Sequence, residues 1–332
     1  YAREVRLMAG LNIGLLGADL SQGGSPILVN LPANDRQARV SAQAGNQINL
    51  YGMHSLSLGE ISAQNLQGER GDIRLYALDD IRDSGAAASA AITGRQVWLE
   101  ALSGTVGTQQ QALRIDLSGS LTALADGLLN LSQGGVHDLV LARVESRSRA
   151  DVTLSSQAGI VNDKQVHAGM SAQRQEPVII GGSLSLTANG SIGGYAQADL
   201  DGAVQNDAII VAAVGDQASI SVSAGGDVAL IQAGEARDSQ GQMQQLHFNA
   251  GQIQARNLWL AARAGSQGQG GDIRLAAGST VTVVGMASLL AAGSFSVAGA
   301  LGSQTAAQIT AGQRLTVRTD RDDRGSRGQA VS

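Results

Sequence analysis

The sequence predicts an all-β protein folded as a parallel β-helix, a solenoid of roughly 14 coils of about 22 residues with loop insertions. Three observations carry this prediction: short stretches in which apolar and polar residues alternate, glycines at the corners between them, and an unusual composition. Of 332 residues 44 are Gly and only 3 are Pro, and aromatic residues make up 2 %. A narrow interior filled by stacked aliphatic side chains leaves little room for rings.

Each strand of the predicted coil is a short alternating stretch. An apolar residue, any residue and a second apolar residue are followed by a small residue, and successive side chains of such a strand point to opposite faces of a sheet. The pattern recurs at residues 72–75, 96–99, 114–117, 151–154, 183–186, 219–222, 257–260 and 272–275. We expect its aliphatic side chains to face the interior of the coil and its polar side chains to face water.

Glycine corners separate these strands, as at residues 189–190, 224–226 and 270–271. Gly supplies the positive φ that tight corners need. A helix with glycine at this density loses about 1 kcal/mol for each one, so helix is excluded for almost the whole chain. Residues 85–91 are the exception, because their run of Ala allows either a turn or two of helix or a corner packed with small side chains.

Longer matches indicate the length of one coil. Leu-Ser-Gln-Gly-Gly at residues 20–24 returns at residues 131–135, and Gly-Asp-Ile-Arg-Leu at residues 71–75 returns at residues 271–275. A looser match relates residues 139–152 to residues 209–220. The separations of all three matches are multiples of about 22 to 23 residues, which is the expected length of one coil.

Four segments interrupt the rhythm and are expected to leave the coil as loops: residues 144–149, 164–177, 195–207 and 235–245. In solenoids such insertions are often where partners bind, and they also arise as tolerated surface variation. The predicted shaft is continuous over residues 1–318, and residues 319–332 form a polar tail or continue into further sequence. The chain starts without Met or a signal-peptide pattern, so we expect an internal segment of a longer protein.

Composition and charge exclude several classes of function. The absence of Cys removes disulfides, thiolate catalysis and cysteine metal sites, and a net charge of −5 carries no electrostatic footprint for nucleic acid. No apolar run reaches the roughly 20 residues of a membrane helix, so we expect no membrane insertion of this segment. No metal or organic cofactor is implied, because the histidines lie far apart in the sequence. They are His54, His137, His167 and His247.

One stretch shows the style of the repeat in full. Residues 219–230 read Ser-Ile-Ser-Val-Ser-Ala-Gly-Gly-Asp-Val-Ala-Leu: an alternating strand, a glycine corner and a second strand that begins with Asp. This style resembles the central repeats of filamentous-haemagglutinin-type exoproteins, the large bacterial adhesins and biofilm-matrix adhesins exported by two-partner secretion. The Asn-Pro-Asn-Gly signature of that family's secretion domain is not present. The resemblance implies a right-handed β-helical shaft, an extracellular or cell-surface location and an outer-membrane secretion partner.

Arg70-Gly71-Asp72 is the first candidate binding motif. Some adhesins of the resembled family carry this tripeptide for integrin contact, which needs a guanidinium and a carboxylate displayed on a protruding loop. The same Gly-Asp pair precedes strands at residues 226–227 and 271–272. A structural corner therefore explains Gly71 and Asp72 without any integrin, and both interpretations are carried forward.

Trp98 and Trp259 each lie between two apolar residues of a strand, so alternation places both indoles on the outer face. An indole ring stacks on a sugar face, and its N–H donates a hydrogen bond. Arg74 and Arg274 occupy the matching outward positions and carry donors suited to carboxylate or phosphate groups. We expect these four residues to contact a saccharide or a partner protein, unless neighbouring loops cover the indoles.

The main enzyme alternative is a β-helical polysaccharide lyase or glycosidase, which needs paired carboxylates on one face. Asp79-Asp80 is the only internal acidic doublet. Adjacent residues of a strand point to opposite sides, so both carboxylates serve one site only at a bend. We therefore expect a protein that is not an enzyme.

Taken together, these features predict the structural shaft of a secreted or cell-surface bacterial adhesin that mediates cell-cell, biofilm-matrix or host attachment and presents a carbohydrate-contact face. The expected partners are an exopolysaccharide, a surface glycan or another cell-surface protein. A stiff rod acts through reach and avidity, because several weak contacts combine through effective concentration. Two alternatives stay open: the stalk of a contact-dependent toxin-delivery exoprotein, and the carbohydrate-active enzyme.

Overall fold

The computed structural model describes residues 3–17, 21, 24–32, 35, 37–87, 90–164, 176–194, 208–298 and 306–319. These residues form β-strands joined by turns, and no α-helix occurs among them. No helix in this part of the chain is long and apolar enough to span a membrane. The chain separates into two compact units, unit 1 (Tyr1–Ala158) and unit 2 (Gly159–Ser332). The predicted all-β class is confirmed.

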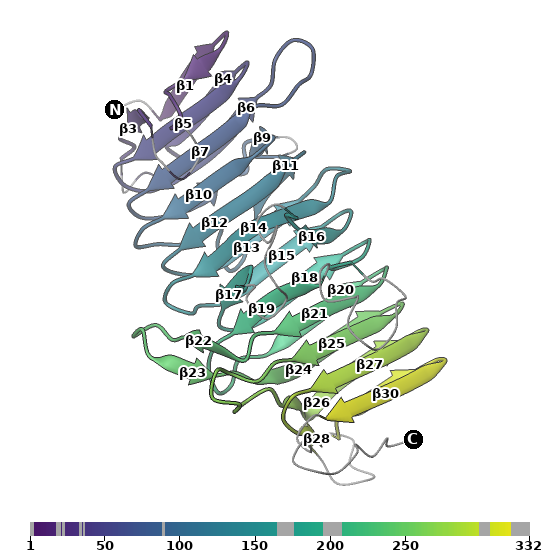
Figure 1. Ribbon diagram of the computed structural model, residues 1–332. Coiled ribbons are helices and arrows are strands. Elements are labelled where there is room, and N and C mark those ends of the chain that lie inside the picture. Colours follow the sequence, from purple (N-terminus) through teal and green to yellow (C-terminus); the bar gives the residue numbers. More distant parts are fainter. Residues whose placement is uncertain are drawn as a thin grey trace. The chain divides into compact units, whose positions relative to one another are not determined.

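Unit 1 consists of two parallel sheets, and the chain passes from one sheet to the other and back in each coil (Figure 1). In order across the first sheet, its strands are β1 (Glu4–Ala9), β4 (Arg39–Ala44), β6 (Leu56–Ala63), β9 (Ile92–Gly94), β11 (Leu113–Leu117), β13 (Leu129–Gln133) and β15 (Val152–Ser156). In order across the second sheet, they are β2 (Asn12–Ile13), β5 (Gln47–Gly52), β7 (Asp72–Ala77), β10 (Val97–Ala101), β12 (Ser120–Ala125) and β14 (Leu139–Ser146). Beside these paths, β3 (Ile27–Val29) pairs with β5 and β8 (Ile81–Asp83) pairs with β6.

Unit 2 is built in the same way from two parallel sheets. Its first sheet contains β18 (Leu184–Ala188), β20 (Ile220–Ala224), β24 (Phe248–Ala255), β26 (Ile273–Val283) and β28 (Phe295–Val297), with β29 (Gln308–Ala311) also paired to β26. Its second sheet contains β17 (Ile179–Gly181), β19 (Ile209–Ala213), β21 (Val228–Gln232), β25 (Leu258–Ala262), β27 (Met286–Ala291) and β30 (Arg314–Thr319). The other strands are β16 (Ile160–Asn162), β22 (Glu235–Arg237) and β23 (Met243–Gln245). Parallel strands stacked coil on coil form a parallel β-helix, as predicted.

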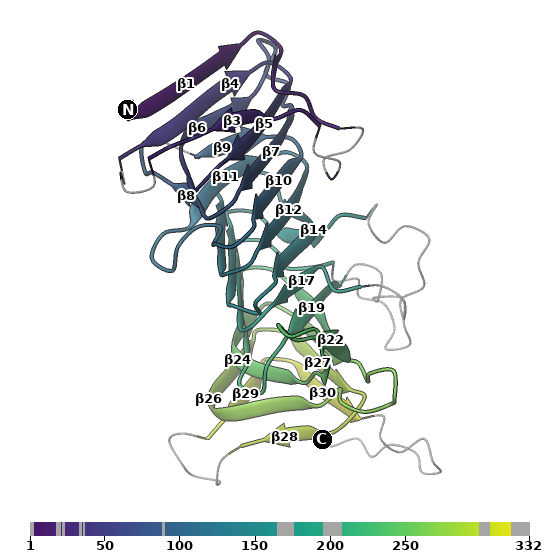
Figure 2. The same cartoon turned by 90° about the vertical axis from the view of Figure 1, so that its left-hand side faces the viewer.

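Aliphatic side chains of successive coils stack in rows inside unit 1. Ile48, Ile73 and Val97 are register partners in β5, β7 and β10, and each is at most 1 % exposed. The next row, two residues further along each strand, consists of Leu50, Leu75 and Leu99. Figure 2 shows these three strands one above the other. Full burial of each such side chain contributes about 1.5–3 kcal/mol, so the rows hold the coils together.

Several coils are longer than the predicted repeat, whereas others, such as those from Leu121 to Leu141 and from Ile209 to Leu230, are slightly shorter. In unit 1 Ile48 pairs with Ile73 and Ile73 pairs with Val97, so each of these coils exceeds the predicted length by a few residues. In unit 2 Val228 pairs with Leu258, so this coil is longer still. The repeat of about 22 residues therefore underestimates these coils, because the segments between strands carry more residues than the sequence matches indicate.

Residues 144–146 do not form part of the predicted loop, although residues 147–148 form a turn. β14 continues to Ser146, and Val144 is fully buried and pairs with Ala123 of β12 after a register shift. The charges that look like a loop lie on the outer side of the strand and turn. There Glu145 accepts hydrogen bonds from Arg143 at 2.7 and 2.9 Å and from Arg149 at 3.1 Å. The prediction is wrong for the strand residues because charged side chains on the outer face of a strand make its sequence look like that of a polar loop.

Residues 235–245 leave the coil as predicted. They form an antiparallel hairpin of β22 and β23, which extends beside the strands of unit 2 in Figure 1. The hairpin turn is closed by Asp238, whose Oδ1 accepts hydrogen bonds from the backbone N–H groups of Gln240 and Gln242 at 2.9 and 2.8 Å. A short polar segment can therefore hold a fixed shape outside the coil.

Several predictions fall on residues that the structure does not describe. Of the predicted loop at residues 164–177 only three residues are described, and residues 195–207 lie wholly outside the described ranges. Of the predicted tail, only Thr319 is described, at the end of β30. Residues 85–87 and 90–91 form no helix, so the helical alternative has no support in those residues. The continuity of one shaft over residues 1–318 stays a prediction.

The second sheet of unit 2 departs from the predicted pattern on its outer face. Ile210 and Ile231 are register partners at outward positions, and both are at most 1 % exposed. They belong to a second hydrophobic cluster outside the coil, together with Leu246 beside the hairpin. The prediction of polar outward side chains is wrong for β19 and β21. Continuous apolar stretches such as residues 209–213 bury both faces of a strand.

Candidate functional site

Arg70-Gly71-Asp72 lies at the corner before the strand β7. The Arg70 guanidinium donates hydrogen bonds of 2.8 and 2.9 Å to the Asp116 carboxylate, and Asp72 accepts two from Arg95 at 2.7 and 2.9 Å. Gly71 packs so closely on Asn46 that a Cβ would overlap the Asn46 carbonyl oxygen. The tripeptide is therefore a corner built into the coil, and both of its charged groups are paired within the chain.

The Gly-Asp corner recurs in unit 2 with the same kind of bonding. Asp272 Oδ1 accepts hydrogen bonds from the Ser294 backbone N–H at 2.7 Å and hydroxyl at 2.9 Å, and Asp227 accepts two from Arg256 at 2.8 and 2.9 Å. Burial acts to raise the pKa of Asp272, but the hydrogen bonds from Ser294 and Arg274 outweigh it and hold that pKa at about 2. The hydrogen bonds from Arg256 lower the pKa of Asp227. Each carboxylate ties its coil to the next.

Trp98 and Arg74 meet on the outer face of the second sheet of unit 1. They are register partners in β10 and β7, and Arg74 Cζ lies 5.8 Å from the centre of the Trp98 ring, a cation–π contact. Trp98 Nε1 donates a hydrogen bond of 3.3 Å to Glu100 Oε2. The side chains of Arg74 and Glu100 are only 11 % and 14 % exposed, and Nε and Nη1 of Arg74 are buried without a hydrogen-bond partner. The structure thus brings together two of the predicted contact residues.

Two tyrosines extend this arrangement. Tyr51 and Tyr76 are register partners in β5 and β7, and their rings stack with centroids 4.8 Å apart and planes 13° apart. Burial raises the pKa of Tyr76. The sequence shows how many residues separate the two tyrosines. A coil of about 22 residues, however, would not place them at equivalent positions of adjacent coils. We call Tyr51, Tyr76, Trp98, Arg74 and Glu100 the aromatic cluster.

Trp259 and Arg274 do not form a second aromatic cluster. Trp259 lies on β25 of the second sheet and packs against the hydrophobic cluster outside the coil. Arg274 lies on β26 of the first sheet and donates a hydrogen bond of 2.8 Å to Asp272. The expected equivalence of Arg74 and Arg274 is therefore wrong. In unit 1 the sequence Gly-Asp-Ile-Arg-Leu leads into β7, which lies in the same sheet as Trp98. In unit 2 it leads into β26 of the first sheet, whereas Trp259 lies in the second sheet.

Asp79 and Asp80 also form a corner. Asp80 accepts hydrogen bonds from the backbone N–H and hydroxyl of Thr105 at 2.7 and 3.1 Å. Asp79 accepts one from Ser103 at 3.3 Å and lies 3.7 Å from His54. The two carboxylates therefore bond to separate residues of the next coil. Within the described ranges, no three His, Cys, Asp or Glu side chains come together in a group that could hold a metal ion.

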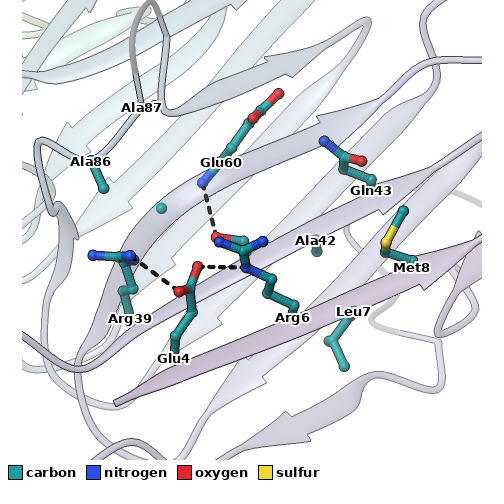
Figure 3. A pocket seen from close by; sticks show the side chains of 12 residues that line it. Glu4, Arg6, Leu7, Met8, Arg39, Ala42, Gln43, Glu60, Ala86 and Ala87 are labelled. Atoms are coloured by element: carbon teal, nitrogen blue, oxygen red, sulfur yellow. Dashed lines mark hydrogen bonds and ion pairs between the residues drawn. The ribbon is translucent and has the colours of Figure 1, made fainter.

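The outer face of the first sheet of unit 1 is hollowed into a groove of about 380 Å³, lined by residues of β1, β4 and β6 (Figure 3). Glu4 lies there between two arginines and accepts hydrogen bonds from Arg6 at 2.8 Å and from Arg39 at 3.1 Å. The hydrogen bond from Arg6, with that from Arg39, lowers the pKa of Glu4. The Glu60 side chain points away from this group in Figure 3. The groove is therefore charged, with most of its charge paired internally.

A bulge accompanies this hollow. The register of β4 and β6 shifts between Val40 and Ala42, where Gly59 lies over Ser41. A Cβ on Gly59 would overlap the Ser41 hydroxyl, which instead accepts a hydrogen bond of 3.4 Å from the Glu60 backbone N–H. A side chain at this position would therefore displace the Ser41 hydroxyl from this hydrogen bond.

The first sheet of unit 2 has the same bulge and a second groove, of about 460 Å³. Gly251 of β24 lies over Ser221 of β20, and the Ser221 hydroxyl accepts a hydrogen bond of 3.3 Å from the Gln252 backbone N–H. Both grooves were missed at the level of the sequence. The signal that could have found them is the shared pattern of Leu-Ser-Leu-Gly-Glu-Ile-Ser-Ala at residues 56–63 and Phe-Asn-Ala-Gly-Gln-Ile-Gln-Ala at residues 248–255.

Comparison of this chain with protein families, with curated proteins and with solved structures finds no match. Its function is therefore argued from its fold and from the contacts described above.

Proposed function

We propose that this chain is the structural shaft of a secreted or cell-surface bacterial adhesin of the filamentous-haemagglutinin-like type. The observation that carries the proposal is that charged residues at the Gly-Asp corners hold coils together instead of converging on one point. Such pairs are Arg70 with Asp116, Asp72 with Arg95, and Asp227 with Arg256. A β-helix secured in this way keeps its shape over a distance and can display attachment sites.

The aromatic cluster is the proposed attachment surface for an exopolysaccharide, a surface glycan or another cell-surface protein. Tyr51, Tyr76 and Trp98 are three of the eight aromatic residues in the chain, and they lie together on one outer face. Nε and Nη1 of Arg74 have no hydrogen-bond partner, but both nitrogens are buried and lie out of reach of a bound molecule. The contact surface that the cluster offers is therefore its rings, which can stack on a sugar face. Export through an outer-membrane partner rests on the sequence resemblance alone.

Adhesion of coated beads tests this proposal. Beads carrying the full segment are expected to attach to surfaces coated with biofilm exopolysaccharide, since many weak contacts add up on a bead. Trp98→Ala should reduce attachment at least tenfold. The matched control, Leu66→Ala, removes a fully exposed apolar side chain outside the aromatic cluster and should leave attachment unchanged. Attachment no better than that of bare beads, or equal for wild type and Trp98→Ala, would refute the proposed surface.

The carbohydrate-active enzyme finds no support in the contacts of Asp79 and Asp80, because each carboxylate bonds to a different residue of the next coil. Incubation of the same polysaccharides with the segment is expected to leave their chain length unchanged in size-exclusion chromatography. Shortened chains would overturn the assignment as a shaft.

A further inference from the structure

We propose that the groove on the first sheet of unit 2 binds a neutral glycan chain. This groove is lined by residues of β18, β20, β24 and β26, and its outward side chains are Ser, Thr and Gln throughout. The inference rests on the proposed function, because it names the chemical class of one adhesive ligand. It concerns a surface separate from the aromatic cluster and can be tested apart from it.

One row of side chains crosses all four strands of the groove. Thr187 pairs in register with Ser223, Ser223 with Gln254, and Gln254 with Thr282. Adjacent strands lie about 4.8 Å apart, so this row spans about 15 Å. A second row lies two residues earlier on each strand, about 7 Å away, and includes Ser185 and Thr280. The resulting strip suits an extended polymer that lies across the strands.

The hydrogen-bonding groups of the first row are unused. Thr187, Ser223, Gln254 and Thr282 are exposed, and their side chains make no hydrogen bond with the part of the chain that the structure describes. Elsewhere on the surface many charged groups are paired, as Asp227 is with Arg256. Hydroxyl and amide groups both donate and accept hydrogen bonds, as sugar hydroxyls do. The row is therefore chemically matched to a sugar chain.

Two features of the groove argue against nucleic acids, acidic glycans and extended peptides as its ligands. None of the described residues that line the groove is ionisable, so nucleic acids and acidic glycans find no cation there. β20 and β24 are each hydrogen-bonded to a strand on both sides, so a peptide cannot add to them as a further strand. The groove of unit 1, by contrast, carries Glu4, Arg6 and Arg39.

The bulged strands shape the groove. Gly251 lies over Ser221, and the register of β24 and β26 shifts again between Ala250 and Gln252. Residues 276–279 of β26 fall outside this pairing, because Leu275 pairs with Ala250 whereas Thr280 pairs with Gln252. Two successive bulges therefore bend the sheet at one level and leave a hollow beside the polar rows.

Binding of the full segment to immobilised polysaccharides tests the proposal by biolayer interferometry. The neutral probes are dextran, mannan, galactan and a β-1,3-glucan, and alginate is the acidic comparator. Wild type is expected to bind at least one neutral probe and to bind alginate at least tenfold more weakly. Gln254→Glu places a charge among the hydroxyls, and Thr187→Ala with Thr282→Ala removes both ends of the row. Each change should weaken neutral binding about tenfold.

The matched control is Gln43→Glu, the same substitution at an exposed outward position of the first sheet of unit 1. It should leave neutral binding within twofold of wild type. Absence of binding to all four neutral probes, equal binding to alginate, or unchanged binding by Gln254→Glu and by the double Thr variant would overturn the inference. Neutral binding that survives both groove changes but is lost in Trp98→Ala would do so as well, while leaving the adhesin proposal intact. Groove binding together with failed bead adhesion would refute the aromatic cluster alone.

Discussion

Asp272 and Ser294 are joined twice through one oxygen: Asp272 Oδ1 accepts a hydrogen bond of 2.7 Å from the Ser294 backbone N–H and one of 2.9 Å from its hydroxyl. Asp272 precedes the strand β26, and Ser294 precedes β28, the strand that pairs with β26. The carboxylate at the start of one strand therefore fixes the start of its neighbour. Asp72 does the same for Gln96, because Asp72 Oδ1 accepts a hydrogen bond of 3.3 Å from the Gln96 backbone N–H.

Removal of the Asp272 carboxylate should weaken the fold. Asp272→Ala is expected to lower the free energy of unfolding by about 1–3 kcal/mol, because it leaves the partly buried N–H of Ser294 without its acceptor. Asp272→Asn keeps an acceptor oxygen and should cost less. Urea unfolding followed by circular dichroism measures both values. A loss for Asp272→Asn as large as that for Asp272→Ala would contradict the importance of the acceptor.

The protein should lose stability in acid. The folded-state pKa of Asp272 is about 2, below its ordinary value of 3.8, and the pKa of Asp227 is also lowered. A carboxyl with a lowered folded-state pKa contributes stability that is fully present above the unfolded pKa and is lost as pH falls through the folded one. The contribution of these two carboxylates to the urea midpoint should therefore stay level from pH 7 to about 5 and be lost between about pH 5 and 2. His247, whose pKa is lowered by burial, should add an earlier fall as pH drops below its ordinary pKa of 6.5. A double variant, Asp227→Asn with Asp272→Asn, should show a shallower fall, and an equally steep one would contradict this assignment.

Gly71→Ala should be strongly destabilising. The new Cβ would overlap the carbonyl oxygen of Asn46, a backbone atom that can move only with its whole coil, so a loss of about 1–3 kcal/mol or more is expected. Gly134→Ala is the control, because the nearest atom to its Cβ, the Ile115 carbonyl oxygen, lies 4.0 Å away. Melting temperatures of the two variants should differ clearly, and equal values would show that the corner can relax.

Arg70-Gly71-Asp72 should not support integrin-dependent cell attachment. Asp72→Glu, which moves the carboxylate one methylene group further from the backbone, is expected to leave the spreading of integrin-bearing cells on the segment unchanged. It should lower the melting temperature, because the longer side chain displaces the paired hydrogen bonds with Arg95. Cell spreading that is lost in Asp72→Glu would show that the tripeptide is displayed after all.

The class of fold and the inward rows follow from alternation alone, because a period of two residues identifies the buried side of each strand. Ile73, Val97 and Leu258 all face the core as predicted. The pairing of coils does not follow, because it depends on the number of residues in each turn. An error of two or three residues per coil is enough to separate Tyr51 from Tyr76, which the structure stacks.

The outer faces were predicted less well, because alternation does not say what covers a side chain. Trp98 and Trp259 have the same local sequence pattern, yet one meets Arg74 and the other packs on an apolar cluster. The difference lies in neighbouring strands: Ile231 of β21 and Ile210 of β19 make the outer face beside Trp259 apolar. The grooves were missed because a bulge changes the register without disturbing the apolar pattern.

Two ion pairs of unit 1 each skip a coil. Arg70 bonds to Asp116, 46 residues away, and Arg147 bonds to Glu100, 47 residues away, so that β9 and β12 lie between the joined segments. When unit 1 is pulled apart by a force, a coil that carries one of these pairs is not free to leave alone, since the coil two positions further on still holds it. We expect the coils that these two pairs join to separate at higher force than the hydrogen bonds of a single strand pair would sustain.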